Sequence, residues 1–314
     1  MRLPWRLVSL VGLALLGLAG AISPLAAAPK VVVSIKPIHA LVAGVMAGIA
    51  EPALIVAGGV SPHTYSLKPS DAERLEAADI VFWIGPIFES FLVKPLAALA
   101  GRAELVELDR EPTMALLPAR LGGAWEADAD ERPRGGARSA LEEDGHLWLD
   151  PANAKAILRV AVDRLSARDL GNAARYAANG AALERRVDAL DQRLRQRLAR
   201  VRRVPFVVFH DAYQYLENRY GLAAIGSITV EPERPPGAKR LQVIRGKVLE
   251  LGARCVFSEP QFEPRLVQTV IAGTRAKTSV LDPEGAALPP GPDLYFALMD
   301  RLGDALVACL GGAG

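Results

Sequence analysis

The sequence predicts an α/β protein of two Rossmann-like lobes, each with a parallel sheet, joined by one long rigid helix. Three observations indicate this fold. Short apolar runs alternate with helical patterns in the first half of the chain, the same alternation returns in the last third, and one long helical pattern over 171–203 separates them. In such folds ligands bind outside the carboxyl ends of the strands, which places a site in the cleft between the lobes.

The first lobe is expected over 29–170. Its predicted strands are apolar runs that end at turn-forming residues, at 31–35, 54–56, 80–84 and 105–108. A helix is expected to begin near His39, and Ser70-Asp71-Ala72-Glu73 is a capping box that predicts a second helix start. Asp150-Pro151 is a further helix start, with Asp as N-cap and Pro in the first turn.

The linking helix is predicted over 171–203. Leucines and one valine recur on one face at spacings of three and four residues, and arginines occupy the other faces. A helix of that length spans roughly 45 Å, enough to run along both lobes. The second lobe is expected over 204–314, with strands at 206–209, 255–258 and 278–281.

Residues 1–28 have the pattern of a secretory signal peptide. Arg2 and Arg6 precede an apolar run over 7–22, and small residues follow. The run is short for a membrane span, which needs about 20 residues, although a retained N-terminal anchor is the alternative. We therefore expect export through a cleaved signal peptide, with no direct membrane insertion.

The mature chain is expected to be nearly neutral. The full sequence has a formal charge of +2, and residues 1–28 contribute two arginines and no acids. A protein without excess positive charge has no electrostatic reason to bind nucleic acid or an anionic membrane. We expect a monomer.

Four residues carry the predicted metal chemistry. His63, His146 and His210 are three of the four histidines in the sequence, and each is expected at or after the carboxyl end of a predicted strand, as is Asp282. Three neutral imidazoles and one carboxylate form a set that suits tetrahedral Zn²⁺. Each residue also has an ordinary interpretation as a turn or hydrogen-bonding residue, and Asp282 precedes Pro283.

Other polar residues near these positions have open roles. The fourth histidine, His39, lies at a helix start and is expected to be structural or to support the site. Asp211 and Glu259 are candidates either for oxygen ligation or for orienting an imidazole.

Cys255 and Cys309 are the only cysteines. In an oxidising compartment an isolated pair predicts a disulfide, with thiolate ligation as the alternative. Cys255 opens its predicted strand, so it lies roughly 13 Å from the edge where the metal site is expected. That separation favours the disulfide.

Residues 126–144 differ in composition from the rest of the chain. They contain seven acids, three arginines and a Pro/Gly cluster, which predicts an exposed, mobile loop. The loop either gathers cations weakly near the site or is a solvated insertion, and we favour the second interpretation.

Six motifs occur in an order that resembles one known family. They lie at 61–71, 145–151, 209–213, 236–238, 258–262 and 281–283, beginning with Ser-Pro-His-Thr-Tyr and ending with Leu-Asp-Pro. Together they resemble the periplasmic zinc-binding component of high-affinity zinc-uptake ABC importers, over about residues 31–309. The resemblance implies a two-lobed receptor that holds Zn²⁺ between its lobes and delivers it to an inner-membrane permease.

The resemblance assigns three ligands and also has departures. It places the family's histidine ligands at His63, His146 and His210, and its cysteine pair, where present, at Cys255 and Cys309. Many members carry a histidine-rich loop where 126–144 lies, and this chain has acids but no histidine there. Some members have a glutamate before the first histidine, where this chain has Pro62, so the fourth position belongs to Asp282 or to water.

Two other functions remain as alternatives. A zinc hydrolase also uses three histidines and an open position, but the sequence contains no H-E-x-x-H or G-x-S-x-G motif, and Glu231 and Glu259 are candidate bases without a supporting motif. A manganese or iron receptor of the same fold would use more oxygen ligands. The three nitrogens favour zinc.

Overall fold

The computed structural model describes residues 27–120, 125, 143–229 and 236–312. Nearly all of the predicted signal peptide lies outside the described residues. So do residues 126–142 of the acidic segment, and Glu231.

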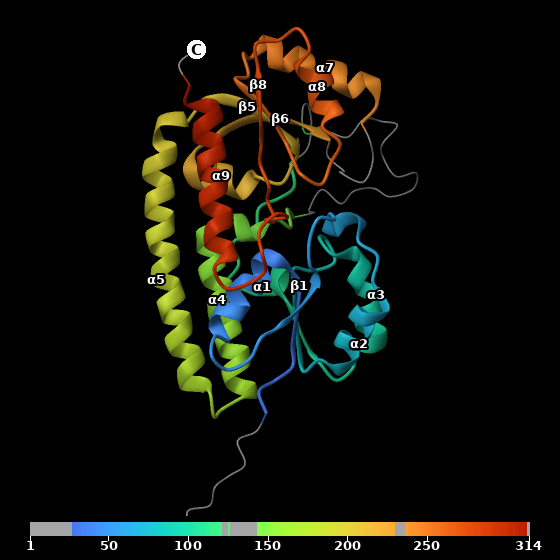
Figure 1. The fold of residues 1–314 in the computed structure, drawn as a ribbon, viewed down its shortest axis with the longest axis vertical. Coiled ribbons are helices and arrows are strands. Elements are labelled where there is room, and N and C mark those ends of the chain that lie inside the picture. Colours follow the sequence, from blue (N-terminus) through green and yellow to red (C-terminus); the bar gives the residue numbers. More distant parts are fainter. Residues whose placement is uncertain (1–26, 121–124, 126–142, 230–235, 313–314) are drawn as a thin grey trace, which may run out of the picture.

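Two separate parallel sheets form the frame of the molecule (Figure 1). The first sheet has the strand order β2-β1-β3-β4, with bounds Ala53–Val56, Val31–Ile35, Ile80–Trp83 and Glu104–Glu107. The second has the order β6-β5-β7-β8, with bounds Ala223–Thr229, Pro205–His210, Cys255–Ser258 and Lys277–Val280. In each sheet the first strand of its half of the chain is central, and all strand pairs are parallel. The carboxyl ends of neighbouring strands therefore meet at one edge.

Helices cover both sheets and join them. Those of the first half are α1 Lys36–Val45, α2 Pro69–Ala77, α3 Val93–Leu99 and α4 Pro151–Arg168. The linking helix is α5 Ala173–Leu198, and those of the second half are α6 Gln214–Tyr220, α7 Ala238–Glu250, α8 Arg265–Ile271 and α9 Leu294–Leu310.

The long helix α5 runs beside both halves of the molecule (Figure 1). It packs against α4 and α1 of the first half and against α9 of the second. The apolar face predicted from spacing is buried, at Leu183, Val187, Leu190, Leu194 and Leu198. One continuous hydrophobic core extends from the first sheet through α5 and α9 to Phe206 and Phe257 of the second sheet. A smaller core lies on the other face of the second sheet, against α7 and α8. The shared core makes the two sheets one packed unit.

The predicted α/β fold with a linking helix is confirmed, and some details differ. Helix α1 begins at Lys36 and not near His39, because Pro37 fits the first helical turn, where an N–H has no intrahelical partner. Helix α2 begins at Pro69, before the predicted capping box, and Asp71 accepts a hydrogen bond from the Lys68 backbone N–H at 3.1 Å. Strand β6 has no counterpart among the predicted strands, because its segment contains Gly226 and Ser227 and lacks a continuous apolar run.

The predicted disulfide is present between Cys255 at the start of β7 and Cys309 in α9. It ties the last helix to the amino-terminal end of β7. His210 ends the neighbouring parallel strand β5, so the disulfide and His210 lie at opposite edges of the second sheet. Among the described residues no helix combines the length and the apolar character needed to cross a membrane.

Candidate metal centre

His63 reaches the centre from the loop that follows β2. After Val56 the chain passes through residues 57–61 and enters a short 3₁₀ turn over Pro62–Thr64. The Ser61 hydroxyl accepts a hydrogen bond from the His63 backbone N–H at 3.3 Å, which fixes the start of the turn. His63 remains partly exposed, whereas the other two histidines of the group are buried.

His146 does not follow a strand, so that part of the prediction is wrong. The apolar run over Leu147–Leu149 is a 3₁₀ turn whose three side chains are all buried. The Asn153 side chain donates a hydrogen bond to the Leu147 carbonyl oxygen at 3.1 Å, and Asp150 caps α4 directly afterwards. A run of three apolar residues is too short for periodicity to separate a strand from a helical turn.

His210 is the last residue of β5, as predicted. It is 4 % exposed. Glu259 follows the neighbouring strand β7, and its Oε1 atom lies 2.8 Å from His210 Nδ1. The two strands therefore deliver an imidazole and its carboxylate partner to the same edge of the second sheet.

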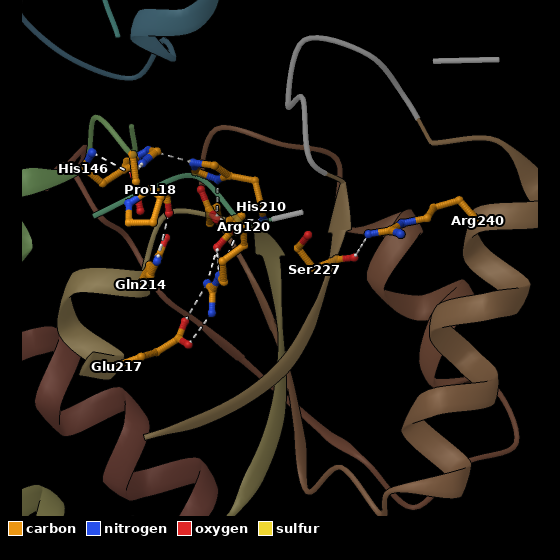
Figure 2. A network of polar contacts seen from close by, with 11 residues as sticks. Pro118, Arg120, His146, His210, Gln214, Glu217, Ser227 and Arg240 are labelled. Carbon is orange, nitrogen blue, oxygen red and sulfur yellow. Dashed lines mark hydrogen bonds and ion pairs between the residues drawn. The ribbon is translucent and has the colours of Figure 1, made fainter. Parts of the chain in front are cut away.

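The three histidines form a compact group. One ring nitrogen from each of His63, His146 and His210 lies within 4.8 Å of the other two. The Nε2 atoms of His146 and His210 are 3.2 Å apart (Figure 2). Tetrahedral zinc with Zn–N bonds of about 2.0–2.1 Å places neighbouring nitrogens roughly 3.3 Å apart. The spacing of the buried pair therefore matches one edge of a zinc coordination tetrahedron.

Each buried imidazole has a carboxylate behind it. Asp144 Oδ1 lies 2.7 Å from His146 Nδ1 and also accepts the His146 backbone N–H at 2.9 Å. Glu259 Oε1 makes the matching contacts with His210. A proton on each Nδ1 facing its carboxylate leaves the Nε2 lone pair for a metal. Both Nε2 atoms face the same point. The tautomers that the two carboxylates select therefore leave two lone pairs directed at one position, where a metal ion could bind.

Aromatic rings enclose the histidines. The Phe88 ring lies edge-on to His63 and to His146, with centroids 4.8 and 5.2 Å away. Trp148 lies 5.4 Å from His146, and Phe262 lies 5.9 Å from His210. These rings keep water from the buried pair and limit how far the imidazoles can rotate.

Burial and the carboxylates have opposite effects on the imidazoles. Burial holds the pKa of His63 well below its usual value, and repulsion from the two neighbouring histidines lowers it further. Burial also holds the pKa of His146 well below its usual value, and repulsion from His210 adds to that effect. Burial also lowers the pKa of His210, but the Glu259 carboxylate outweighs it and the net pKa is raised. Burial raises the pKa of Asp144 to about 7. At neutral pH two of the three imidazoles are thus neutral and ready to bind a metal.

Asp282 is not brought into this group. Its carboxylate accepts hydrogen bonds from the backbone N–H groups of Glu284, Gly285 and Ala286 at 3.2, 2.9 and 2.6 Å, and from the Gln261 side chain at 3.4 Å. The residue follows β8, as predicted, but its oxygens organise the loop after that strand. Short side chains after a strand commonly bond to backbone N–H groups a few residues ahead.

Asp211 is engaged in an ion-pair network and does not orient an imidazole. The Arg120 guanidinium donates to Asp211 and to Glu217 in α6 (Figure 2). It also stacks on the Trp125 ring at 3.5 Å. The Tyr215 hydroxyl donates to the Asp144 carbonyl oxygen and accepts from the Leu117 N–H. This network joins the segment before residue 121 to the second half of the molecule, beside the two buried histidines.

His39 is a structural residue. It lies in α1, it is 8 % exposed, and its Nε2 atom lies 2.9 Å from the Pro52 carbonyl oxygen. Burial lowers its pKa. It is not part of the histidine group.

Sequence reasoning missed Asp144 and the aromatic rings. Asp144 is one of the acids of the predicted loop, and it lies two residues before a histidine in Asp-Gly-His. That spacing is the signal that could have found it, because an Asp side chain readily bonds to the N–H two residues ahead. Phe88 follows a turn with no motif of its own, and its contact depends on the tertiary fold.

The fold and the site together define a class of protein. The molecule has two parallel-sheet lobes joined by a long helix, and the three imidazoles lie between the carboxyl ends of β2 and β5. This arrangement is characteristic of a metal-binding solute receptor. The profile of the family "Zinc-uptake complex component A periplasmic" matches residues 31–309. The chain belongs to this family, whose members are solute-binding proteins and not enzymes.

Individual relatives agree with this assignment. The high-affinity zinc uptake system protein ZnuA of Brucella abortus (strain 2308) is 46% identical over 304 residues, covering 89% of this chain and 91% of the relative. The high-affinity zinc uptake system protein ZnuA of Yersinia pestis is 34% identical over 296 residues. The match covers 90% of this chain and 92% of the relative. A crystal structure of ZnuA superposes with a TM-score of 0.75 at 25% identity, covering 90% of this chain and 99% of that one.

We predict that Glu259→Gln weakens zinc binding by about 10- to 100-fold, because the amide cannot supply the charge that holds the His210 tautomer. Isothermal titration with Zn²⁺ measures the change. Glu217→Gln is the matched control, since it removes a buried carboxylate that pairs with Arg120 and contacts no histidine. Equal losses in the two variants would show that general charge, and not the Glu259–His210 contact, is responsible.

We predict that zinc affinity falls as pH decreases through the raised pKa of His210, because a proton on Nε2 then occupies the metal position. Above that pKa the affinity is expected to level off. Below it, log affinity is expected to fall with a slope of about one per pH unit for one proton displaced. Zinc titrations between pH 5 and about 8, the range in which histidine usually changes charge, measure how the affinity depends on pH. A flat profile would contradict imidazole ligation.

Proposed function

We propose that this protein is the extracytoplasmic receptor of a zinc-uptake system, that it captures Zn²⁺ with His63, His146 and His210, and that it delivers the ion to an ABC permease. The observation that carries this proposal is the approach of the His146 and His210 Nε2 atoms to 3.2 Å with a carboxylate behind each ring. Membership of the zinc-uptake family supports the same function.

The donor set favours zinc over manganese or iron. Three imidazole nitrogens suit Zn²⁺, whereas Mn²⁺ prefers carboxylate, carbonyl and water oxygens. Asp144 and Glu259 point at the Nδ1 atoms, so they act behind the ligands. Their negative charge offsets the charge of the ion in a buried place, where an unbalanced divalent cation would be costly.

We propose that water fills the fourth coordination position. Both Asp282 oxygens are engaged with backbone N–H groups, and a zinc ion held by three protein ligands commonly completes its tetrahedron with water. His63 is the partly exposed member of the group, so the ion reaches the buried pair past this residue.

The hydrolase alternative is not supported by the geometry. Glu259, the described candidate for a general base, is committed to His210 Nδ1, and Asp211 is committed to Arg120. A base has to reach a metal-bound water in order to activate it. The described carboxylates beside the site instead orient imidazoles or form ion pairs.

Capture and release follow from how the ligands are divided. His63 and His146 belong to the first half of the chain and His210 to the second. Separation of the two halves would therefore split the ligand set and release the ion.

We propose lobes over 29–170 and 204–314 with 171–203 as the link. We also propose a signal peptide over 1–28 that directs the chain to the periplasm, and a monomeric receptor.

We predict that His63→Ala, His146→Ala and His210→Ala each weaken zinc binding at least about 100-fold, because each removes one of three protein ligands. Isothermal titration of the mature chain measures the affinities. His39→Ala is the control: it removes a buried histidine that bonds to the Pro52 carbonyl oxygen, so it is expected to lower stability and leave zinc affinity unchanged. Wild-type affinity in any of the three ligand variants would contradict the proposed set.

A further inference from the structure

The segment 281–288 between β8 and α9 forms no helix or strand, and side chains from distant parts of the chain hold it. We call it the strap. The Tyr213 hydroxyl donates to the Leu281 carbonyl oxygen at 3.1 Å, and Trp148 Nε1 donates to the Pro283 carbonyl oxygen at 2.9 Å. Lys36 Nζ donates to three more carbonyl oxygens, those of Gly285, Ala286 and Leu288, at 3.2, 2.9 and 3.1 Å.

Each of these donors is linked to one of the three histidines. Trp148 lies two residues after His146, in the 3₁₀ turn that His146 precedes, and Tyr213 lies three residues after His210. Lys36 lies against Gly58 in the loop that leads to His63. A Cβ atom built on Gly58 would lie 3.0 Å from Lys36 Nζ and 3.8 Å from the Ala286 carbonyl oxygen. The strap therefore contacts all three elements that carry the proposed ligands.

Lys36 is the charged member of this arrangement. It is 5 % exposed, and its three acceptors match the three N–H donors of an ammonium group. On the other side of the same turn, the Asp282 carboxylate accepts the backbone N–H groups of Glu284, Gly285 and Ala286. The turn thus lies between a cation that binds its carbonyl oxygens and an anion that binds its N–H groups.

We propose that Lys36 is a positioning residue for zinc binding: it joins the His63 loop of the first half to the strap of the second half and so keeps His63 beside the His146–His210 pair. This inference rests on the proposed function. Lys36 does not touch the ion. Without its three hydrogen bonds the strap would lose its contact with α1 and the His63 loop, and His63 would leave the ion more often.

The sign of the effect separates positioning from electrostatics. Lys36 carries a positive charge near a site that binds a cation, so its removal would tighten zinc binding if charge alone mattered. A residue with a purely structural role would change stability and leave zinc binding as it is. Positioning alone predicts weaker binding with faster dissociation, because a bound ion then loses a ligand more readily.

The test is the rate of zinc dissociation from the loaded mature chain, measured by stopped flow with an excess of chelator. We expect Lys36→Met to accelerate dissociation and weaken affinity by roughly 10-fold. Tyr176→Phe is the control for stability: it removes one buried hydrogen bond, to Asp169 at 2.9 Å in the α4–α5 connection, and is expected to keep the wild-type rate. Thermal unfolding of the zinc-free variants compares their stabilities.

A second pair of variants tests the same contact from the His63 loop. Gly58 and Gly59 both have positive φ, so alanine is strained at each, but only at Gly58 would the new Cβ meet Lys36, because nothing lies within 4 Å of the Cβ at Gly59. Gly58→Ala is expected to accelerate dissociation more than Gly59→Ala. This pair decides the question if Lys36→Met does not fold.

The outcomes are distinct. Faster dissociation in Lys36→Met with a wild-type rate in Tyr176→Phe, together with faster dissociation in Gly58→Ala than in Gly59→Ala, supports the proposal. A wild-type rate of zinc dissociation, or tighter zinc binding, in Lys36→Met overturns the proposal. If Lys36→Met does not fold, equal dissociation rates in Gly58→Ala and Gly59→Ala overturn it. A wild-type chain that binds no zinc would instead refute the proposed function.

Discussion

The approach of two imidazole nitrogens in a buried place is the constraint on which the site depends. His146 Nε2 and His210 Nε2 lie 3.2 Å apart, and each ring has its Nδ1 atom against a carboxylate. Two lone pairs directed at one point repel each other unless a proton or a metal ion lies between them. The surrounding fold tolerates this arrangement because Asp144 and Glu259 hold the rings from behind and aromatic side chains prevent their rotation.

The fold supplies this constraint from widely separated parts of the chain. Parallel sheets bring His210 and Glu259 together, because β5 and β7 are neighbours and end at the same edge. The first half contributes His63 from a loop and His146 from a turn that is closed by Asn153. The core shared through α5 and α9 prevents the halves from moving independently at their packed side. Any motion that separates the three histidines would therefore have to occur where side-chain hydrogen bonds, such as those of Lys36 and Arg120, cross between the halves.

Much of this organisation could be predicted from the sequence, and the exceptions have physical causes. Buried strands such as Val31–Ile35 and the leucine face of α5 follow directly from periodicity. His210 was placed correctly because its strand is continuous and apolar. His146 is predicted at or after the end of a strand and does not follow one, since the three apolar residues after it form a 3₁₀ turn. Asp282 is predicted among the ligands because it follows a strand, but Asp-Pro-Glu-Gly is also a turn sequence, and the Asp282 carboxylate bonds to backbone N–H groups of residues 284–286.

The central claim is that three imidazoles bind the transported ion, and zinc K-edge X-ray absorption of the loaded mature chain tests it most directly. The structure predicts four-coordinate zinc with three nitrogen ligands at about 2.0–2.1 Å, multiple scattering from imidazole rings, and one oxygen ligand. A first shell of five or six oxygens with weak imidazole scattering would contradict the account, because it would place the ion away from His63, His146 and His210.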